Sequence, residues 1–319
     1  MIHPLWHAYP VIYRQLQQVQ TLLADRTHCR VPAVDARIQA QVHAGGKMLR
    51  AGSLLLFARF GQADAHEERQ LIHAAAAIET LHLATLVHDD VLDQAATRRG
   101  EATVADAVGN RAAIYAGDFL FSVYFELLAE VAPDVGNVSV NAQAMRRIFL
   151  GELDQNGPVP GAMTLHRYLR QIGGKTAALF KLACYQGALL GECLPRQQHA
   201  AASFGYYLGM GFQMQDDVLD VAGNPQKMRK PAFEDLHNGI VNLPHLCALA
   251  VDDGTLKQYL AAGDLTHAAQ VIKETGVAPA QALANRYIDK ALTSLQQLPD
   301  TPTRLALETL TRRQAGRKD

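Results

Sequence analysis

Two copies of one short acidic segment carry the side chains of this chain that could do chemistry. Asp-Asp-Val-Leu-Asp occurs at 89–93 and again at 216–220, while the residues around the two copies differ. The match therefore indicates a repeated site and not a repeated domain. On a helix, the first and third aspartates are four residues apart and the second and third are three apart, so all three share one face. The six residues are Asp89, Asp90, Asp93, Asp216, Asp217 and Asp220.

Each acidic segment favours the binding of a metal ion. Three carboxylates on one helix face repel each other, and near the carboxyl end of a helix they also oppose the helix dipole. The donors are all oxygens, which suits a hard ion, and Mg²⁺ commonly takes one or two carboxylates together with phosphate oxygens of a substrate. A solvated acidic face is the alternative for one copy. Two identical copies, each after an apolar helical run, favour the metal site.

Three basic clusters accompany the acidic segments. Two of them directly follow a pair of glycines at an expected helix start, where free backbone N–H groups can bind phosphate. Each cluster alone could be a turn with solvated charge. Together with two metal-type segments they predict two diphosphate ligands, one held on metal and the other held by Arg and Lys. The clusters are Lys47 and Arg50 after Gly45-Gly46, Arg98 with Arg99, and Lys175 with Thr176 after Gly173-Gly174.

His82 precedes Asp89 by seven residues, so it lies on nearly the same face of the expected helix. Its place two turns before the acidic segment favours a role in ligand binding. A core histidine that is hydrogen-bonded to backbone is the alternative.

The pattern along the chain is helical nearly throughout. Ala, Leu, Gln and Glu are abundant, and alternating β-branched runs of strand length are missing. Gly and Pro concentrate at a few breaks, none of which resembles a long flexible linker. The sequence therefore predicts one all-α domain over residues 1–319. Helices are expected at 48–62, 68–95, 105–131, 138–156, 175–192, 198–222 and 240–252, with weaker ones at both ends.

The charge balance restricts the class of ligand, and the cysteines indicate the cellular compartment. With 30 basic and 31 acidic residues the net charge is −1, so no overall field attracts nucleic acid or an anionic membrane. The 4 cysteines form no CxxC pair and no zinc spacing, which favours a reduced, cytoplasmic setting. No signal peptide is expected, and no membrane span is predicted, because Asp118 and Glu126 interrupt the nearest apolar run.

An ordered series of motifs resembles the trans-isoprenyl diphosphate synthases, also called polyprenyl synthetases. The resemblance runs from about Gly45 to Pro244 and so covers most of the chain. Single motifs could arise by chance, whereas the whole series in register is highly specific. In order, the motifs are GGKMLR, HLATLVHDDVLDQAATRRGEATV, AGDFLF, GGKTAALF, GMGFQMQDDVLD and KPAFEDLHNGIVNLP.

The resemblance implies an all-α isoprenoid synthase bundle with a central cavity. It implies head-to-tail condensation of isopentenyl diphosphate with an allylic diphosphate to a linear all-trans product. Mg²⁺ would be held by Asp89, Asp93 and Asp216, with the other three aspartates in support and with Lys175 as a further catalytic residue. The implied isopentenyl diphosphate site is Lys47, Arg50, His82 and Arg99. The implied allylic diphosphate site is Arg98, Lys175, Thr176, Gln213 and Lys230.

This chemistry accounts for the absence of a nucleophilic triad from the sequence. An allylic diphosphate ionises when metal and Lys or Arg stabilise the leaving diphosphate. The allylic cation is then attacked by the double bond of isopentenyl diphosphate, and an apolar cavity excludes the water that would quench it. No Ser/His/Asp or Cys/His arrangement is needed.

The residues just before the first acidic segment bear on product length. Ala84 and Thr85 lie about one turn before Asp89, where the resemblance implies that aromatic residues act as a floor that stops growth. Both are small here, and Leu81 on the next turn is of moderate size. We therefore expect a long-chain product, hexaprenyl or longer, of the kind used for quinone side chains. A geranylgeranyl or farnesyl product is the alternative, in which case these are ordinary helix-packing residues.

The chain departs from the family pattern at three positions. Met48 and Ala51 stand where the family often has Arg and Pro, and neither is expected to touch substrate. Ile240 stands where many members have Lys, which puts one contact to the allylic diphosphate in doubt. Some long-chain members, including catalytic subunits of two-component synthases, also lack this lysine.

Other interpretations are open at the level of sequence. A terpene cyclase shares one acidic motif, but its second motif is of the NDxxSxxxE type and it lacks the isopentenyl diphosphate site. A non-catalytic partner subunit would lose its acidic motifs, and a helical scaffold would leave them unexplained. The chain is expected to form a homodimer, or to act as the catalytic subunit beside a small partner, with peripheral membrane contact for product release.

Overall fold

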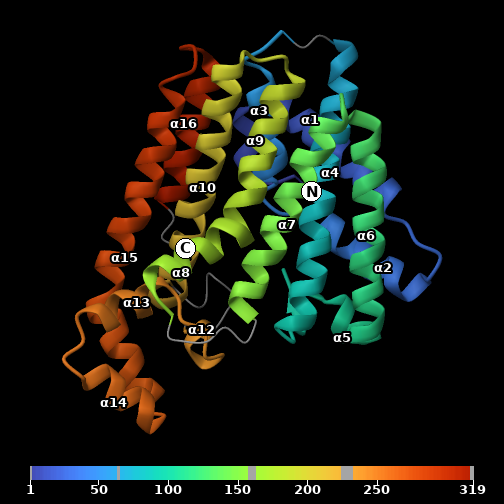
Figure 1. Cartoon of the computed structure of the whole chain (residues 1–319). Helices are drawn as coiled ribbons and strands as arrows, with labels where there is room; N and C mark the ends of the chain where they lie inside the picture. Colours follow the sequence, from blue (N-terminus) through green and yellow to red (C-terminus); the bar gives the residue numbers. More distant parts are fainter. Residues whose placement is uncertain (1, 63–64, 157–162, 224–232, 317–319) are drawn as a thin grey trace. The chain divides into compact units, whose positions relative to one another are not determined.

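The structure of the chain, a computed structural model, describes residues 2–62, 65–156, 163–223 and 233–316. Nearly all elements in these ranges are helices (Figure 1), so the all-α prediction is confirmed. The α-helices are α1 (Pro10–Arg26), α2 (Pro32–Ala44), α3 (Leu49–Ala58), α4 (Ala65–Leu92), α5 (Val104–Val108), α6 (Asn110–Val131), α7 (Val135–Asn156), α8 (Leu165–Ile172), α9 (Ala178–Leu190), α10 (Pro195–Ala222), α12 (Glu234–His237), α13 (Leu243–Ala250), α14 (Thr255–Ala262), α15 (Leu265–Leu295) and α16 (Pro302–Ala315). The other elements are the 3₁₀-helix η1 (Pro4–Ala8), the π-helix η2 (Gly173–Ala177) and the short strands β1 (Thr97–Arg98) and β2 (Glu101–Ala102).

Local sequence signals explain where many of these helices begin. A polar side chain just before the helix accepts a backbone N–H from the first turn of α5, α8, α13, α15 and α16. Such a cap satisfies one of the N–H groups that a helix start leaves without an intrahelical partner. Proline in the first turn of α1, α2, α13 and α16 acts in a related way, because it has no N–H to satisfy.

Contacts between residues divide the chain into two compact units. Unit 1 comprises Met1–Ala142 and Leu182–His199, and unit 2 comprises Gln143–Lys181 and Ala200–Asp319. The helices α7, α9 and α10 contribute residues to both units. The expectation of one domain over 1–319 stays a prediction.

Unit 1 is built around α4, which runs beside α6 (Figure 1). The helices approach closely at Gly117 of α6, because a Cβ there would overlap the imidazole of His88. The Nε2 of this imidazole lies 3.1 Å from the carbonyl oxygen of Ile114. In the same unit, Trp6 from η1 is fully buried against α3, where Gly52 leaves room for the indole ring. Gly52 therefore allows α3 to pack closely on Trp6, and Gly117 allows α6 to pack closely on His88 of α4.

Two helices of unit 1 are long and apolar enough to cross a membrane by length and composition, over Glu68–Leu92 and Asn110–Val131. Buried core helices pass the same test, and 61% of the window in α4 is buried. Because α4 packs on α1, α3 and α6, the finding is weak evidence for a span. The expected lack of a membrane span stays a prediction.

Unit 2 is organised by α10 and α15. One apolar cluster gathers around Met210 and Met214 of α10 and includes residues of α8, α13 and α15. A Cβ at Gly209 would lie 2.6 Å from the Cα of Ala177, and a Cβ at Gly211 would lie 2.8 Å from the Cδ1 of Ile288. Small residues on α10 thus allow it to pass closely by both η2 and α15.

The helix bounds differ from the expected ones for local reasons. The expected helix 105–131 is interrupted at Gly109, whose φ of 88° ends α5 before α6 begins. The C-terminal region is more helical than expected, since α15 runs for 31 residues in spite of Pro279. A Cβ at Gly276 of this helix would overlap the carbonyl oxygen of Pro244. Close packing on α13 therefore outweighs the low helix propensity of these residues.

Candidate active site

The first acidic segment lies at the carboxyl end of α4, in unit 1. The backbone N–H of Asp93 donates to the carbonyl of Asp89 at 2.8 Å, so helical geometry extends across the segment. Asp89 is half-buried and Asp93 is exposed. Asp90 is buried instead, and its Oδ1 accepts from Nε and Nη2 of Arg98 at 2.7 and 2.6 Å. Burial raises the pKa of Asp90, and the charge of Arg98 opposes that rise.

A tight hairpin places the two arginines that follow the segment. The strands β1 and β2 pair antiparallel around Arg99 and Gly100, whose φ values are 55° and 85°. Two positive φ angles are typical of the two-residue turn that suits the twist of a hairpin. The turn directs the arginines to different partners: Arg98 contacts Asp90, while the Arg99 guanidinium donates to the carbonyl of Gly45.

An aromatic side chain, Trp6, and a basic one, Arg99, both contact the glycine-rich segment before α3. The indole Nε1 of Trp6 donates to the carbonyl of Lys47 at 2.6 Å. The Arg99 guanidinium lies over Gly46, where a Cβ would come within 2.6 Å of Nη2. Met48 is buried in a left-handed conformation, with φ 45°, and leads into α3. The close approach of a guanidinium is a physical reason for glycine at position 46.

Positive charge gathers around Glu79 and His82 of α4. Burial raises the pKa of Glu79, and the charges of Arg50 and Arg99 oppose the rise. Burial, followed by the charges of Arg50 and Arg99, lowers the pKa of His82 well below its usual value. Unit 1 therefore brings together three of the four side chains predicted to bind isopentenyl diphosphate. A cluster with this charge attracts a dianionic or trianionic ligand.

The two departures from the family pattern in this region lie inside the unit. Met48 and Ala51 are both buried. The backbone N–H of Ala51 donates to Oε1 of Glu79 at 3.1 Å. A proline at position 51 could not make this contact, because it has no N–H.

The second acidic segment lies near the carboxyl end of α10, in unit 2. Asp217 is buried, and its Oδ2 accepts from the Tyr168 hydroxyl at 2.7 Å and from the Leu243 backbone N–H at 3.1 Å. Its Oδ1 accepts from Nε2 of Gln213 at 3.0 Å. Burial raises the pKa of Asp217 to about 7, against the effect of these hydrogen bonds.

The other two aspartates of this segment are half-buried. Asn242 ties one of them to α12, because its Nδ2 lies 3.4 Å from Oδ2 of Asp220 and 3.0 Å from Oδ2 of Asp235. The same side chain caps α13, since its Oδ1 accepts the backbone N–H of His245 at 3.2 Å. The start of α13 therefore contacts two of the three aspartates in the second segment.

The predicted basic cluster of unit 2 lies on the π-helix η2, between α8 and α9. Such π-helical turns are rare and frequently mark functional sites. Lys175 Nζ pairs with Oε2 of Glu152 at 2.9 Å, and the Thr176 hydroxyl donates to Oε1 of Gln213 at 2.7 Å. At Gly151, α7 comes so close that a Cβ would overlap the backbone nitrogen of Lys175.

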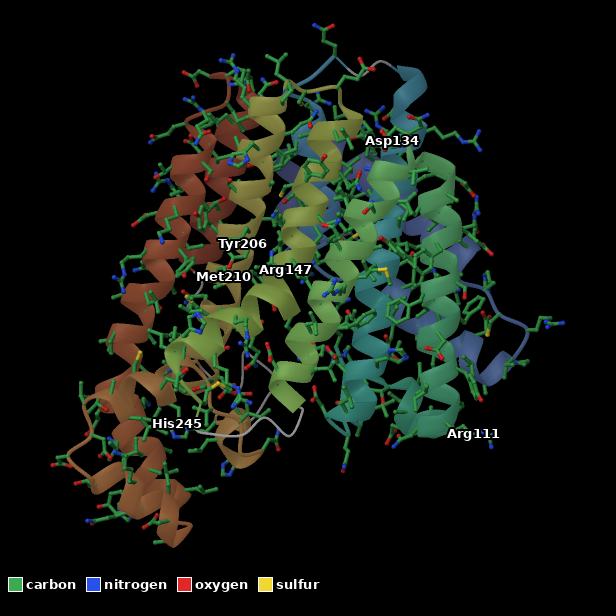
Figure 2. The ribbon with its side chains drawn as sticks, in the orientation of Figure 1. Arg111, Asp134, Arg147, Tyr206, Met210 and His245 are labelled. Carbon is green, nitrogen blue, oxygen red and sulfur yellow. The ribbon has the colours of Figure 1, made fainter. Side chains whose placement is uncertain are left out.

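Helix α10 packs on Gly173, the first glycine of η2. A Cβ at Gly173 would lie 3.2 Å from the Tyr206 hydroxyl and 3.7 Å from the Met210 sulfur, both labelled on α10 in Figure 2. A Cβ at Gly174 would lie 2.6 Å from the carbonyl oxygen of Arg147 on α7. The two glycines are needed for packing, and they position the lysine and the threonine that follow.

The carboxylates fit a hard divalent cation better than a zinc-type ion. Within the part of the chain that the structure describes, no three His, Cys, Asp or Glu side chains converge as a ready metal site. Magnesium-type ions need only one or two carboxylates, because phosphate oxygens and water complete the coordination. Asp89 of α4 and Asp93, directly after the end of α4, supply such a pair of oxygen donors, one helical turn apart.

The structure places the predicted site residues in two groups, and their binding and catalytic roles stay predictions. Lys230 lies outside the described residues, so its place is not given. Ile240 is half-buried after α12. Unit 1 holds Lys47, Arg50, His82, Asp89, Asp90, Asp93, Arg98 and Arg99, and unit 2 holds Lys175, Thr176, Gln213, Asp216, Asp217 and Asp220.

The residues expected to govern product length lie on α4. Leu81 and Ala84 are fully buried, and Thr85 is half-buried with its hydroxyl donating to the carbonyl of His82 at 2.8 Å. Ala84 and Thr85 have small side chains, and Leu81 has one of moderate size. Their role in chain length stays a prediction.

Several side chains that position the predicted residues were not found by sequence reasoning. Glu152 and Tyr168 come from helices that carry none of the recognised aspartates, and only the fold brings them to Lys175 and Asp217. Two weak signals existed: Trp6 is the only tryptophan of the chain, and Asn242 precedes a Leu-Pro helix start.

Comparisons with known proteins agree with the motif series. Residues 31–275 match the family model described as polyprenyl synthetase. Among curated relatives, component 2 of heptaprenyl diphosphate synthase from Geobacillus stearothermophilus is 38% identical over 277 residues, which cover 84% of this chain and 85% of that protein.

Solved structures of similar chains share the fold. Geranylgeranyl pyrophosphate synthase from Lactobacillus brevis has a TM-score of 0.90 and 39% identity, and the match covers 98% of this chain and 99% of that one. A polyprenyl synthase from Caulobacter crescentus, complexed with calcium and isoprenyl diphosphate, has a TM-score of 0.89 and 31% identity over 99% of this chain and 97% of that one. The chain is thus a prenyltransferase that belongs to the polyprenyl synthetase family.

Proposed function

We propose that this chain condenses isopentenyl diphosphate with an allylic diphosphate, head to tail, to give a linear all-trans polyprenyl diphosphate. One observation carries the proposal. Helix α4 presents Asp89 and Asp93 at its end, and seven residues earlier it carries His82 among the charges of Arg50 and Arg99. Seven residues of helix span about 10 Å. Donors for a metal and a basic cluster for a diphosphate therefore lie on and beside α4, at a spacing that suits two diphosphate substrates.

The reaction needs one bond to break and one to form. The C–O bond of the allylic diphosphate breaks, and its electron pair leaves with the diphosphate. The double bond of isopentenyl diphosphate then supplies the electrons of the new C–C bond to the allylic carbon. A proton leaves the adduct for the released diphosphate, so no side chain has to act as nucleophile.

The chain's own residues bind and orient the two diphosphates. Arg50, His82 and Arg99 are proposed to hold isopentenyl diphosphate, because the charges of the two arginines and the N–H groups of all three side chains stabilise an anion that stays bound during the step. On η2 and α10, Thr176 and Gln213 already contact each other and are proposed to orient the allylic diphosphate.

The proposed metal is Mg²⁺, held by Asp89, Asp93 and Asp216. A divalent cation, when bound, stabilises the negative charge that develops on the leaving diphosphate. Oxygen donors alone are present in each acidic segment, which favours a hard ion. The calcium in the Caulobacter polyprenyl synthase complex supports the same class of ion here.

The proposed product is long-chain, hexaprenyl or longer. The small side chains of Ala84 and Thr85 support this length, and so does the name of the heptaprenyl synthase component. A geranylgeranyl product is the second candidate, because the Lactobacillus enzyme of that name is 39% identical.

The proposed assembly is a homodimer, or a heteromer with a small partner subunit, in the cytoplasm. The word component in the name of the Geobacillus relative supports a partner. Ile240 supports a long-chain synthase, since some long-chain members, including catalytic subunits of two-component synthases, also lack a lysine at this position.

Product analysis tests the proposal. The purified chain is incubated with Mg²⁺, labelled isopentenyl diphosphate and, in turn, dimethylallyl, geranyl, farnesyl and geranylgeranyl diphosphate, and the dephosphorylated products are sized by chromatography. Linear products longer than farnesyl support it, and a product that stops at farnesyl contradicts the long-chain part. If the chain alone is inert, a lysate of its source cells is added. Absence of labelled product in both cases contradicts the proposed reaction.

A further inference from the structure

The middle aspartate of each acidic segment differs from its neighbours. Asp90 and Asp217 are 1% and 6% exposed. By contrast, Asp89 and Asp216 are half-buried and Asp93 is exposed. The same burial occurs in two different units, with different partners around it, so it is a property of the segment and not of one local environment.

In unit 1 the buried carboxylate holds an arginine. Oδ1 of Asp90 accepts from both Nε and Nη2 of Arg98, at 2.7 and 2.6 Å. A guanidinium held through two of its nitrogens is restricted in orientation as well as in position. The Arg98 side chain is 28% exposed, so its contact with Asp90 does not enclose it completely.

In unit 2 the buried carboxylate begins a chain of hydrogen bonds. Asp217 accepts from Gln213 Nε2 at 3.0 Å, and Gln213 Oε1 in turn accepts from the Thr176 hydroxyl at 2.7 Å. Tyr168 and the Leu243 backbone N–H hold the other oxygen of Asp217, at 2.7 and 3.1 Å. The carboxylate is therefore fixed before it contacts the glutamine.

The Oδ1 of Asp217, which accepts a hydrogen bond from Gln213, determines which way the Gln213 amide points. An amide has one acceptor oxygen and one donor nitrogen, and a carboxylate accepts only. If the amide were reversed, its oxygen would face Oδ1 of Asp217 without a hydrogen between them. The Thr176 hydroxyl would then lose its acceptor. Asp217 thus sets the donor pattern that Gln213 and Thr176 together present to a ligand.

We propose that the middle aspartate of each segment is a positioning residue for the allylic diphosphate: Asp90 holds Arg98, and Asp217 holds Gln213 and, through it, Thr176. The inference rests on the proposed function for the identity of the ligand. Within each segment, the two less buried aspartates are then available to bind the metal. The buried middle aspartate arranges the side chains that contact phosphate oxygens.

The test combines substitution with two readouts. Asp90→Asn and Asp217→Asn keep side-chain size and remove the charge, and Asp89→Asn is the matched variant of a proposed metal ligand. Steady-state kinetics give KM for the allylic diphosphate, kcat and the Mg²⁺ concentration for half-maximal rate. Calorimetry gives the affinity for inorganic pyrophosphate at saturating Mg²⁺, a readout that does not need turnover. Asp300→Asn, at an exposed Asp–Arg pair with Arg304, is the control.

For both middle aspartates we expect KM for the allylic diphosphate to rise about tenfold, with the Mg²⁺ half-saturation unchanged. Asp89→Asn should shift the Mg²⁺ half-saturation instead. Double variants sharpen the result: Asp217→Asn should add less than twofold in a Gln213→Leu background, and Asp90→Asn should add less than twofold in an Arg98→Ala background. Independent, multiplicative effects, or a Mg²⁺ shift equal to that of Asp89→Asn, would overturn the proposal.

Folding is checked by circular dichroism for every variant. If Asp217→Asn does not fold, Tyr168→Phe removes one donor from Asp217 and keeps its charge, with Tyr259→Phe as control. Tyr168→Phe should raise KM for the allylic diphosphate. An unchanged KM would contradict the proposed chain of hydrogen bonds from Asp217 through Gln213 to Thr176. If the wild type binds pyrophosphate but makes no prenyl product, the proposed function fails while the calorimetric comparison still tests the positioning role.

Discussion

At the scale of single residues, the identity of the neighbour explains several positions better than the residue's own chemistry does. Gly46 is the clearest case, because its missing side chain leaves the space that the Arg99 guanidinium fills. Its neighbour Gly45 accepts a hydrogen bond from the same guanidinium. The glycines of this segment thus shape a basic surface as well as opening a helix.

Gly46→Ala tests this role. The new Cβ would displace the guanidinium of Arg99, so we expect KM for isopentenyl diphosphate to rise about tenfold or more, the loss that one charge-assisted hydrogen bond of about 1.5–3 kcal/mol implies. The value of kcat should change less. Steady-state kinetics with isopentenyl diphosphate varied measure both.

Gly316→Ala is the matched control, because a Cβ there would lie 3.4 Å from its nearest neighbour, at ordinary contact distance. Equal kinetics for wild type and Gly46→Ala would show that Arg99 does not depend on this space.

His82 gives a pH prediction. Burial and the positive charges of Arg50 and Arg99 lower its pKa in the folded protein well below the usual value. The unfolded chain therefore binds a proton at His82 below about pH 6.5 that the folded chain does not, and stability falls as pH decreases through that range. In His82→Gln this contribution is removed.

The measurement is urea unfolding of both proteins from pH 8 to pH 5. We expect the free energy of unfolding of the wild type, relative to His82→Gln, to decrease toward pH 5, with a slope of at most about 1.4 kcal/mol per pH unit. A relative stability that stays flat or increases toward low pH would mean that His82 can be protonated in the folded chain.

At the scale of elements, glycine contacts between helices set the geometry of the basic groups. At the crossing of α7 and η2, both Gly151 and Gly174 face backbone atoms of the other segment. This crossing carries Lys175 into contact with Glu152. A residue with a side chain at either position would have to move the π-helix.

Gly151→Ala is therefore expected to destabilise the protein by about 1–3 kcal/mol, the usual cost of overpacking, and to lower the rate because Lys175 moves. Urea unfolding and steady-state rate measure the two effects, with Gly316→Ala again as control. A fully stable and fully active Gly151→Ala would contradict the close crossing.

Helix α4 carries the prediction on product length. A large side chain at Ala84 or Thr85 is expected to shorten the product, because it would close the path of the growing tail. Ala84 is fully buried, so Ala84→Phe also needs a stability measurement, whereas half-buried Thr85 can accept Phe with less overpacking. Product sizing of both variants beside the wild type measures the effect, and unchanged length in both would exclude these positions as determinants.

At the scale of the whole molecule, the sequence predicted the helical class and the order of the motifs but not the partners of single side chains. The repeat of Asp-Asp-Val-Leu-Asp located both segments, and helical period placed its three aspartates on one face. The structure buries Asp90 and Asp217, because Arg98 and Tyr168 reach them from other elements. Such contacts depend on the fold and leave no local pattern.

The elements that were missed have similar reasons. Gly109 looked like a tolerable glycine within one helix, and its φ of 88° instead separates α5 from α6. Only weaker helices were expected near the C-terminus, yet α15 continues through Pro279. The π-helix at Gly173–Ala177 has no sequence signal beyond its glycines. In α15 and in the π-helix, close packing at Gly276 and Gly174 outweighs local propensity.

The central claim is that carboxylates of the two acidic segments hold divalent ions that stabilise the leaving diphosphate. The most direct measurement is the rate of prenyl product formation, under the conditions that give wild-type turnover, for wild type, Asp89→Ala, Asp216→Ala and the control Asp300→Ala, each with Mg²⁺ and with excess chelator. We predict at least about a hundredfold loss for Asp89→Ala and Asp216→Ala, little change in stability, full activity for Asp300→Ala, and no turnover in chelator. Wild-type rates in either motif variant, or turnover without a divalent ion, would contradict the account.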